Sequence, residues 1–218
     1  MRTFFTQTFA FVATVVLLSS CASSYKAVTP ENITYSAKSE SNNVVLQYKH
    51  GVLAERGNKK YVKKESRNFV QVVAVKLTNN SDQAINVSND VKFFSGENQF
   101  TPLDPNVAHA RLKQGVPIYL LYLGFTFTKI TSTEMVNGQV TETGSFPIGV
   151  ILGPGLTLFN MIRAGGANQQ MLQNLERYNI ANKQILPGET LHGLVVVPNS
   201  SYNPLNIKVG TEAVQARQ

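Results

Sequence analysis

The pattern of hydrophobic and polar positions divides the chain into β-type flanks and a different middle. Short runs with period-two alternation or continuous apolar character, bounded by turn residues, fill residues 33–103 and 185–209. Residues 104–184 instead show helix-type periodicity and two uncharged stretches. The pattern predicts a mainly β fold in one domain at 33–209. Its two flanks are expected to form an antiparallel β-sandwich, with 104–184 as a largely helical, apolar insertion.

One strand stands out because its centre is apolar on both faces. Phe69 to Leu77 reads FVQVVAVKL, which suits a strand at the centre of a sandwich. The turn residues Asn79-Asn80-Ser81-Asp82 follow it. Further strands are predicted at 44–48, 84–87, 91–94, 191–197 and 205–209.

Two helices are predicted inside the insertion. Asp104 can cap a helix that has Pro105 at its first position and runs to residue 114. A second, amphipathic helix is predicted at 167–178, and Gly165-Gly166 is expected to separate it from the segment before it. Its apolar stripe, of a kind typical of core packing, comprises Met171, Leu172, Leu175 and Tyr178.

The two uncharged stretches are the least ordinary feature of the chain. They run from Val116 to Phe127 and from Phe146 to Ile162. Between them, 129–143 predicts a hairpin with its tip at Asn137-Gly138. Three interpretations remain open: the stretches are core, they insert into a membrane as a hairpin, or they form an interface for a partner.

The length of the stretches bears on this choice. The first has twelve residues, too few for a spanning helix of about 20, and Gly153-Pro154-Gly155 interrupts the second. Gly149 and Gly153 have the small-xxx-small spacing that permits close helix contact. The residues that we expect at an interaction surface are Tyr119, Tyr122, Ile151 and Leu158.

A strongly basic stretch, RGNKKYVKK, occupies residues 56–64. One interpretation is a site for anionic headgroups or glycan phosphates. The other, which we favour from the sequence, is a solvated hairpin tip whose lysines discourage pairing at a strand edge.

The N-terminus has the three parts of a secretory signal. Arg2 makes the first residues positive, Phe9 to Leu18 is apolar, and Ser19-Ser20 supplies the small residues of a cleavage site. Cys21, the only cysteine in the chain, follows directly. Three interpretations of this segment are open: a lipoprotein signal, which the next paragraph describes, an ordinary signal peptide followed by an incidental cysteine, and an uncleaved N-terminal membrane helix.

Leu18-Ser19-Ser20-Cys21 resembles the lipobox of bacterial lipoproteins. The resemblance implies that residues 1–20 are a lipoprotein signal peptide. It also implies that Cys21 carries acyl chains, such as palmitate, and becomes the first residue of the mature chain. The small, polar residues 21–32 are then expected to be a tether. Ala22, in place of the aspartate that retains enteric lipoproteins at the inner membrane, implies an outer-membrane lipoprotein that faces the periplasm.

Two further segments resemble parts of immunoglobulin-like sandwich domains in exported proteins. The first is TNNSDQAINV at 78–87, and the second is LPGETLHGLVVVP at 186–198. The resemblance is to a pattern shared by many such domains, and it implies the same fold class as the hydrophobic pattern.

Composition adds three constraints. Removal of residues 1–20 takes away Arg2 alone among the charges, so the formal net charge falls from +7 to +6. With Cys21 acylated, no disulfide can form, and the fold must depend on burial. Nothing resembles a nucleic-acid-binding module, so no nucleic acid is expected as a partner. Residues 210–218 are expected to be a tail.

No catalytic constellation is evident in the sequence. There is no G-x-S-x-G motif, and His50, His109 and His192 lack the spacing of a zinc site. Gly149 to Gly155 lacks the Lys-Ser/Thr ending of a phosphate loop. We therefore expect no enzyme, no metal and no cofactor.

The sequence leaves two expectations about function. The first is a non-enzymatic, lipid-anchored envelope protein that binds a protein partner or the membrane surface through its apolar insertion. The alternative is a glycan- or lipid-binding module of the envelope. In that module, Tyr119 and Tyr122 would supply stacking and the lysines at 59–64 would supply charge.

Overall fold

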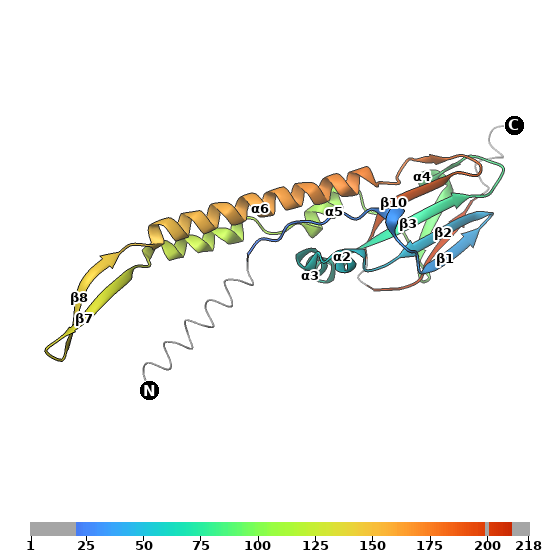
Figure 1. Cartoon of the computed structure of the whole chain (residues 1–218). Helices are drawn as coiled ribbons and strands as arrows, with labels where there is room; N and C mark the ends of the chain where they lie inside the picture. Colours follow the sequence, from blue (N-terminus) through green and yellow to red (C-terminus); the bar gives the residue numbers. More distant parts are fainter. Residues whose placement is uncertain (1–20, 199–200, 211–218) are drawn as a thin grey trace. The chain divides into compact units, whose positions relative to one another are not determined.

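The computed structural model describes residues 21–198 and 201–210. The predicted signal peptide at 1–20 and the tail at 211–218 lie outside these residues. The described chain contains several antiparallel sheets and a set of helices (Figure 1). The prediction of a mainly β fold that also contains helices is therefore confirmed. It divides into two compact units. We call residues 21–24 and 115–167 the hairpin unit, and residues 25–114 and 168–210 the sheet unit.

A four-stranded antiparallel sheet forms the centre of the sheet unit (Figure 1). Its order is β1 (Ala37–Ser41), β2 (Val44–Lys49), β3 (Gln71–Asn79) and β10 (Thr190–Val197). The strand predicted at 69–77 is confirmed as β3, which has a neighbour on both sides and is buried along most of its length.

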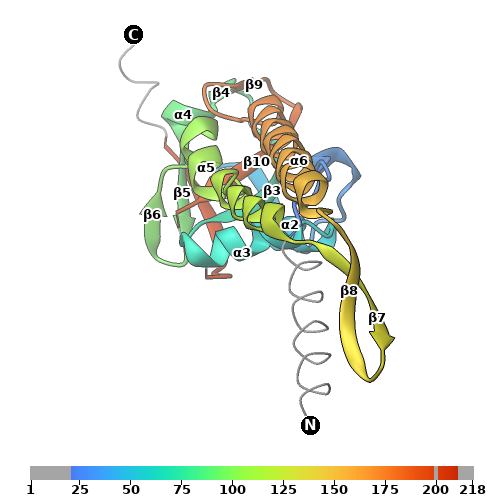
Figure 2. The ribbon, with the colours of Figure 1, turned by 90° about the vertical axis from the view of Figure 1, so that its left-hand side faces the viewer.

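Three more strands form a second antiparallel sheet, in the order β11 (Leu205–Val209), β5 (Val91–Ser95) and β6 (Asn98–Phe100). Figure 2 shows β5 and β6 as neighbours. A short pair joins β4 (Ile85–Asn86) to β9 (Gln184–Ile185). One hydrophobic core draws on all of these sheets, with members that include Leu46, Val75, Phe93, Ile185, Val195 and Ile207.

The sheet unit also contains helices where a sandwich flank was predicted. These are α2 (Val52–Glu55), α3 (Lys59–Arg67) and α4 (Val87–Asp90), and η1 (Pro30–Asn32) lies within the predicted tether. The hairpin tip expected at 56–64 is therefore wrong, because those residues join α2 to α3 and form most of α3. The helix predicted at 104–114 is confirmed as α5 (Pro105–Leu112), and the Asp104 side chain accepts a hydrogen bond from the Asn106 N–H at 2.8 Å.

Residues 25–32 are packed against the sheet unit and do not run free as a tether would. Tyr25, Val28 and Pro30 are buried. The Asn174 amide accepts from the Val28 N–H and donates to the Val28 carbonyl, both at 2.9 Å. Asn58 makes the same two bonds to Lys26, both at 2.8 Å. These amide clamps supply the backbone bonds that a strand would obtain from a sheet.

The hairpin unit begins with the 3₁₀ helix η2 (Pro117–Phe127). Strands β7 (Ile130–Val136) and β8 (Gln139–Phe146) follow, joined at Asn137 and Gly138, whose φ angles are +53° and +79°. The predicted hairpin and its tip are thus confirmed. The chain then enters α6 (Gly149–Arg177), which runs beside η2 over the hairpin unit (Figure 1).

The separation expected at Gly165-Gly166 is absent, because α6 continues through both glycines and through Pro154 as one helix of 29 residues. The stretch at 146–162 and the helix predicted at 167–178 therefore belong mostly to one element. Within the described residues, no helix combines the length and the apolar character needed to cross a bilayer.

Candidate functional site

Large apolar side chains cover the outside of the hairpin unit. Phe127 is 90% exposed, and both Ile151 and Leu158 are 62% exposed. The apolar surface, as we use the term below, consists of Ile118, Leu120, Leu121, Leu123 and Phe127 of η2, and Val150, Ile151, Leu152, Leu156, Leu158, Phe159 and Ile162 of α6. Contiguous apolar surface of this extent is uncommon on a water-soluble monomer and marks a contact site.

The buried side of α6 in the hairpin unit is small and polar. Its members recur at spacings of four and three residues, as one stripe of a helix should. They are Gly149, Gly153, Thr157, Asn160 and Ala164. The Thr157 hydroxyl donates to the Gly153 carbonyl at 2.8 Å. This part of α6 therefore reverses the usual arrangement of a surface helix, whose apolar stripe faces inward.

The two glycines at 149 and 153 allow α6 to approach the end of η2 closely. A Cβ at Gly149 would overlap the Phe125 carbonyl oxygen and lie 2.6 Å from the Thr126 oxygen. A Cβ at Gly153 would overlap the Thr126 hydroxyl and lie 2.8 Å from the Thr126 nitrogen. The small-xxx-small spacing seen in the sequence thus corresponds to a close contact in the structure.

The structure separates the four residues expected at an interaction surface into two pairs. Ile151 and Leu158 are exposed on α6. Tyr119 and Tyr122 are buried instead, with their rings stacked at 6.2 Å between centroids and 7° between planes. The expectation that these tyrosines are exposed is therefore wrong, because the apolar residues on either side of them take the outer positions of η2.

Cys21 lies in the same unit as the apolar surface, and it is exposed. The next residue, Ala22, is buried against Tyr119, Tyr122 and Ala164. Its N–H donates to the Asn160 side chain at 2.7 Å. This bond holds the backbone next to Cys21 on the middle of α6, so Cys21 belongs to the unit that carries the apolar surface.

Charged residues in the hairpin unit lie at the ends of its helical part. Lys129 pairs with Glu142 at 3.7 Å on the β hairpin, where Glu134 also lies. At the other end, the Arg163 guanidinium lies 5.9 Å from the centroid of the Phe159 ring. The apolar surface between these ends contains no charge.

The β hairpin itself is exposed on every residue of both strands. No other strand of the described chain pairs with β7 or β8. An isolated two-stranded ribbon is marginally stable in water, so its order depends on the turn at Asn137-Gly138 and on the helices that hold its ends.

A buried polar cluster lies in the sheet unit, where α3 meets residue 25. The Tyr25 and Tyr61 rings form an edge contact at 5.2 Å, and the Tyr25 hydroxyl donates to Asn174 at 2.7 Å. Burial, then the charges of Tyr61 and Glu65, raise the pKa of Tyr25. Burial also raises the pKa of Glu65 to about 7, although the Val72 N–H, which donates to this carboxylate at 2.7 Å, opposes the shift.

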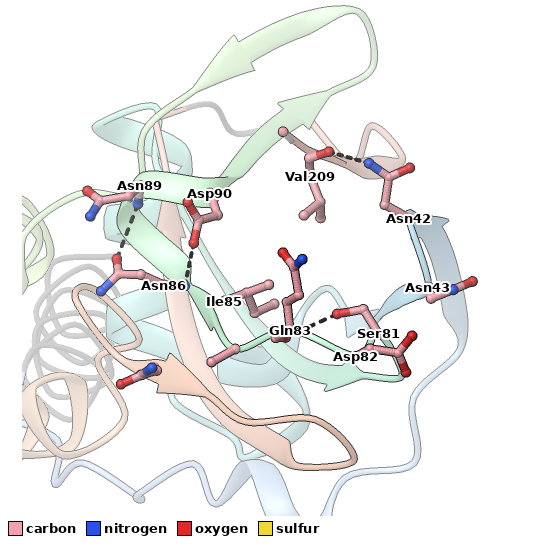
Figure 3. A pocket seen from close by; sticks show the side chains of 13 residues that line it. Asn42, Asn43, Ser81, Asp82, Gln83, Ile85, Asn86, Asn89, Asp90 and Val209 are labelled. Carbon is pink, nitrogen blue, oxygen red and sulfur yellow. Dashed lines mark hydrogen bonds between the residues drawn. The ribbon is translucent and has the colours of Figure 1, made fainter. Parts of the chain in front are cut away.

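The sheet unit has one large hollow, of about 780 Å³, lined by loops at one end of its sheets (Figure 3). Several of its polar side chains form hydrogen bonds to the backbone of the segments that line the hollow. Asn86 accepts from the Ser88 and Asn89 N–H groups, Asp90 accepts from the Asn86 N–H, and the Asn42 amide donates to the Val209 carbonyl. These bonds give the polar wall a structural role.

Each of the three histidines contacts different residues. The His50 ring bonds to Gln71 and to the Asn203 carbonyl, and His192 lies 3.4 Å from the Tyr35 hydroxyl. Burial, followed by the charge of Lys113, lowers the pKa of His109. In the part of the chain that the structure describes, no three His, Cys, Asp or Glu side chains gather where they could hold a metal ion.

Comparison with family models, curated proteins and solved structures finds no match to this chain. Its function must therefore be argued from its own residues. The bond between Ala22 and Asn160 was not predicted from the sequence, because 138 positions separate its two partners. No local pattern signals such a contact, although Ala22 and Ser23 are small enough for close packing.

Proposed function

We propose that this protein is a non-enzymatic, lipid-anchored component of the bacterial envelope, attached through acyl chains on Cys21. The hairpin unit enters the same membrane leaflet as those chains. The sheet unit is an immunoglobulin-like sandwich that carries the rest of the molecule into the periplasm, at the inner face of the outer membrane. The observation that carries the proposal is the exposed apolar surface in the same compact unit as the exposed Cys21.

The arrangement of side chains around α6 supports immersion of this surface. At 100° per residue, Val150, Ile151, Phe159 and Leu156 point in different directions away from the small, polar stripe. A helix that is apolar on all its open sides is typical of a lipid or protein interior. Most of its backbone groups bond within the helix, as hydrocarbon requires, although Pro154 has no N–H to donate to the Val150 carbonyl.

The position of the anchor supports lipid as the occupant. Ala22 is held on α6 by Asn160, so acyl chains on Cys21 would leave the protein from the same unit that carries the apolar surface. The anchor would thus bring the apolar surface to the bilayer without a further partner. An anchored protein gains binding free energy from each additional apolar side chain that leaves water.

The size of the hairpin unit fits one leaflet. A helix is about 10 Å across, and half of a hydrocarbon core of about 30 Å is about 15 Å. The helical pair can therefore lie within a leaflet, parallel to the membrane plane. In that orientation Lys129 at one end and Arg163 at the other would extend to the headgroups.

The alternative, a glycan-binding module, is less well supported. Tyr119 and Tyr122 were expected to stack on a glycan, and both are buried. Its charged part, on α3, belongs to the sheet unit and is considered in the next subsection.

Vesicle flotation tests the proposal with a matched pair of variants. Residues 21–218 with Cys21→Ser are mixed with neutral phosphatidylcholine vesicles, so that no acyl chain on the protein contributes. We expect Leu158→Asp to abolish flotation, since a charge in hydrocarbon costs about 3 kcal/mol. Leu186→Asp, a change at an exposed leucine of the sheet unit, should leave flotation unchanged.

Thermal melting and light scattering identify the other outcomes. If Leu158→Asp lowers the melting temperature as a core substitution would, the side chain is buried in the native protein and the proposal is wrong. If the parent protein forms stable oligomers that Leu158→Asp dissociates, and does not float, the apolar surface binds another copy and the membrane assignment is wrong.

A further inference from the structure

The basic side chains of α3 share one face of that helix. Lys59, Lys63 and Arg67 are four residues apart, and Lys60 and Lys64 repeat this spacing one position later. At 100° per residue, these five positions cover an arc of about 140°. Tyr61 and Glu65 lie on the opposite side, where they are buried.

Few carboxylates offset this charge. Lys59, Lys63, Lys64 and Arg67 form no ion pair with any residue in the ranges 21–198 and 201–210. The nearest carboxylate in sequence before α3, Glu55, pairs with the Lys49 ammonium at 2.7 Å. Burial raises the pKa of Glu65, the one acidic residue of α3, to about 7, so near neutral pH it contributes less than a full negative charge.

Other basic residues lie near both ends of α3. The Lys26 ammonium lies 3.7 Å from the position that a Cβ on Gly57 would occupy, so it approaches the turn before α3. At the other end of the helix, the Asn68 amide donates to the Arg111 carbonyl, which places the end of α5 beside the end of α3.

The covalent chain limits how far this face can be from the proposed anchor. Tyr25 packs on Tyr61 of α3, and both belong to the sheet unit. Only three residues separate Tyr25 from Cys21, and the four fully extended Cα-to-Cα steps between them reach about 14 Å. Acyl chains on Cys21 therefore hold α3 close to the lipid headgroups, whatever the conformation of residues 21–24.

We infer that the basic face of α3, formed by Lys59, Lys60, Lys63, Lys64 and Arg67, is a binding surface for the phosphate groups of anionic phospholipids. This inference rests on the proposed anchoring at Cys21, and it adds a preference for anionic membrane to the hydrophobic contact of the hairpin unit. The charges attract the headgroups without inserting, so the contact weakens as salt rises.

Binding of residues 21–218 carrying Cys21→Ser to two kinds of vesicle tests the inference. One vesicle contains phosphatidylcholine alone, and the other contains phosphatidylcholine mixed with phosphatidylglycerol. The triple variant Lys59→Gln, Lys63→Gln, Arg67→Gln should bind the anionic vesicles about 100-fold more weakly at low salt, since each basic residue near the surface contributes about fivefold. Salt at about 0.5 M should remove the difference.

A second triple variant, Lys38→Gln, Lys92→Gln, Lys183→Gln, is the matched control, because it makes the same change in net charge at exposed lysines elsewhere in the sheet unit. We expect it to bind anionic vesicles within about threefold of the parent. The double variant Lys59→Arg, Lys63→Arg, which keeps both charges, should bind like the parent.

Three results would overturn the inference: equal losses in both triple variants, no loss in the α3 variant, or loss in the Lys→Arg variant. The first would mean that net charge alone directs binding. Binding to pure phosphatidylcholine reports on the hairpin unit, so failure of that contact is seen separately from failure of α3.

Discussion

The sheets of the sheet unit and the α6 segment of the hairpin unit bury opposite kinds of residue. In the sheet unit, Leu46, Val75 and Val195 are buried between strands, and lysines such as Lys38 and Lys92 face water. In the hairpin unit, glycine, threonine and asparagine line the inside of α6, and leucine, isoleucine and phenylalanine cover its outside. The same helix, α6, takes part in both units.

The difference is the one expected if the two units face different solvents, as the proposed function requires. The sheet unit follows the rule of a water-soluble domain, where burial of apolar area drives folding. In a bilayer, lipid tails are as apolar as leucine, so close packing of small residues and hydrogen bonds take over that role. Gly149, Gly153 and Asn160 supply such packing and bonding in the hairpin unit.

The largest expected effect compares the same substitution in the two units. Leu46→Ala removes a side chain that is 0% exposed, and we expect a loss of about 3 kcal/mol in the free energy of unfolding. Leu158→Ala, at a side chain that is 62% exposed, should change it by less than about 0.5 kcal/mol in water. Urea denaturation measures both, and similar losses would remove the distinction between the units.

The next prediction concerns Glu65 and the dependence of the sheet unit on pH. Its pKa is raised from 4.5 to about 7 in the folded protein, so the folded state keeps a proton that the unfolded state has already lost. Stability is then full below the lower value and falls by about 3 kcal/mol as the pH rises from 4.5 to about 7.

Glu65→Gln should remove this fall, because glutamine keeps an acceptor for the Val72 N–H and carries no charge. Denaturation at several pH values checks the expectation. A variant whose stability falls as steeply as that of the parent would show that another group is responsible.

A pair of glycine substitutions tests the close packing in the hairpin unit. Gly153→Ala forces a Cβ into Thr126, and we expect it to destabilise the contact between α6 and η2 by about 2 kcal/mol. Gly155→Ala meets nothing within 4 Å and should stabilise the helix by up to about 1 kcal/mol. Amide hydrogen exchange in α6 measures these local changes. Equal protection in the two variants would argue against the close approach.

The smallest expected effect is at the Lys129–Glu142 pair. Both side chains are more than half exposed, and the distance between them is 3.7 Å. Exposed pairs contribute little, so Lys129→Gln should change stability by less than about 0.5 kcal/mol. A larger loss, measured by thermal melting, would mean that the β hairpin depends on this pair and is less accessible than the structure indicates.

Local signals predicted those elements whose determinants lie close together in the sequence. Asp104 with Pro105 marked the start of α5, Asn137-Gly138 marked the hairpin tip, and the apolar run at 69–77 marked β3. Each depends on the conformational preference of a few neighbouring residues.

The errors arose where position mattered more than composition. The lysines at 59, 60, 63 and 64 are spaced as one face of a helix, but their number suggested a solvated turn. Gly165-Gly166 suggested a helix end, yet the cost of about 1 kcal/mol per glycine is small beside the contacts on either side, where Ala164, Ala167 and Asn168 are buried.

The candidate site was predictable only in part. The uncharged stretches at 116–127 and 146–162 identified the region, but no sequence rule showed that Tyr119 and Tyr122 face inward while Ile151 and Leu158 face outward. The contact of Ala22 with Asn160 joins residues far apart in sequence. It holds the first part of the expected tether on the hairpin unit, next to the proposed anchor at Cys21.

The most direct test of the account is the environment of residue 158 in the presence of membrane. The chain contains no tryptophan, so Leu158→Trp provides a single fluorescent reporter, and Leu186→Trp provides its control in the sheet unit. With vesicles, we predict that the emission of Trp at 158 moves to shorter wavelength and is quenched by brominated acyl chains, while the control does not change. Emission at 158 that stays unshifted and unquenched on vesicles that bind the protein would contradict the account.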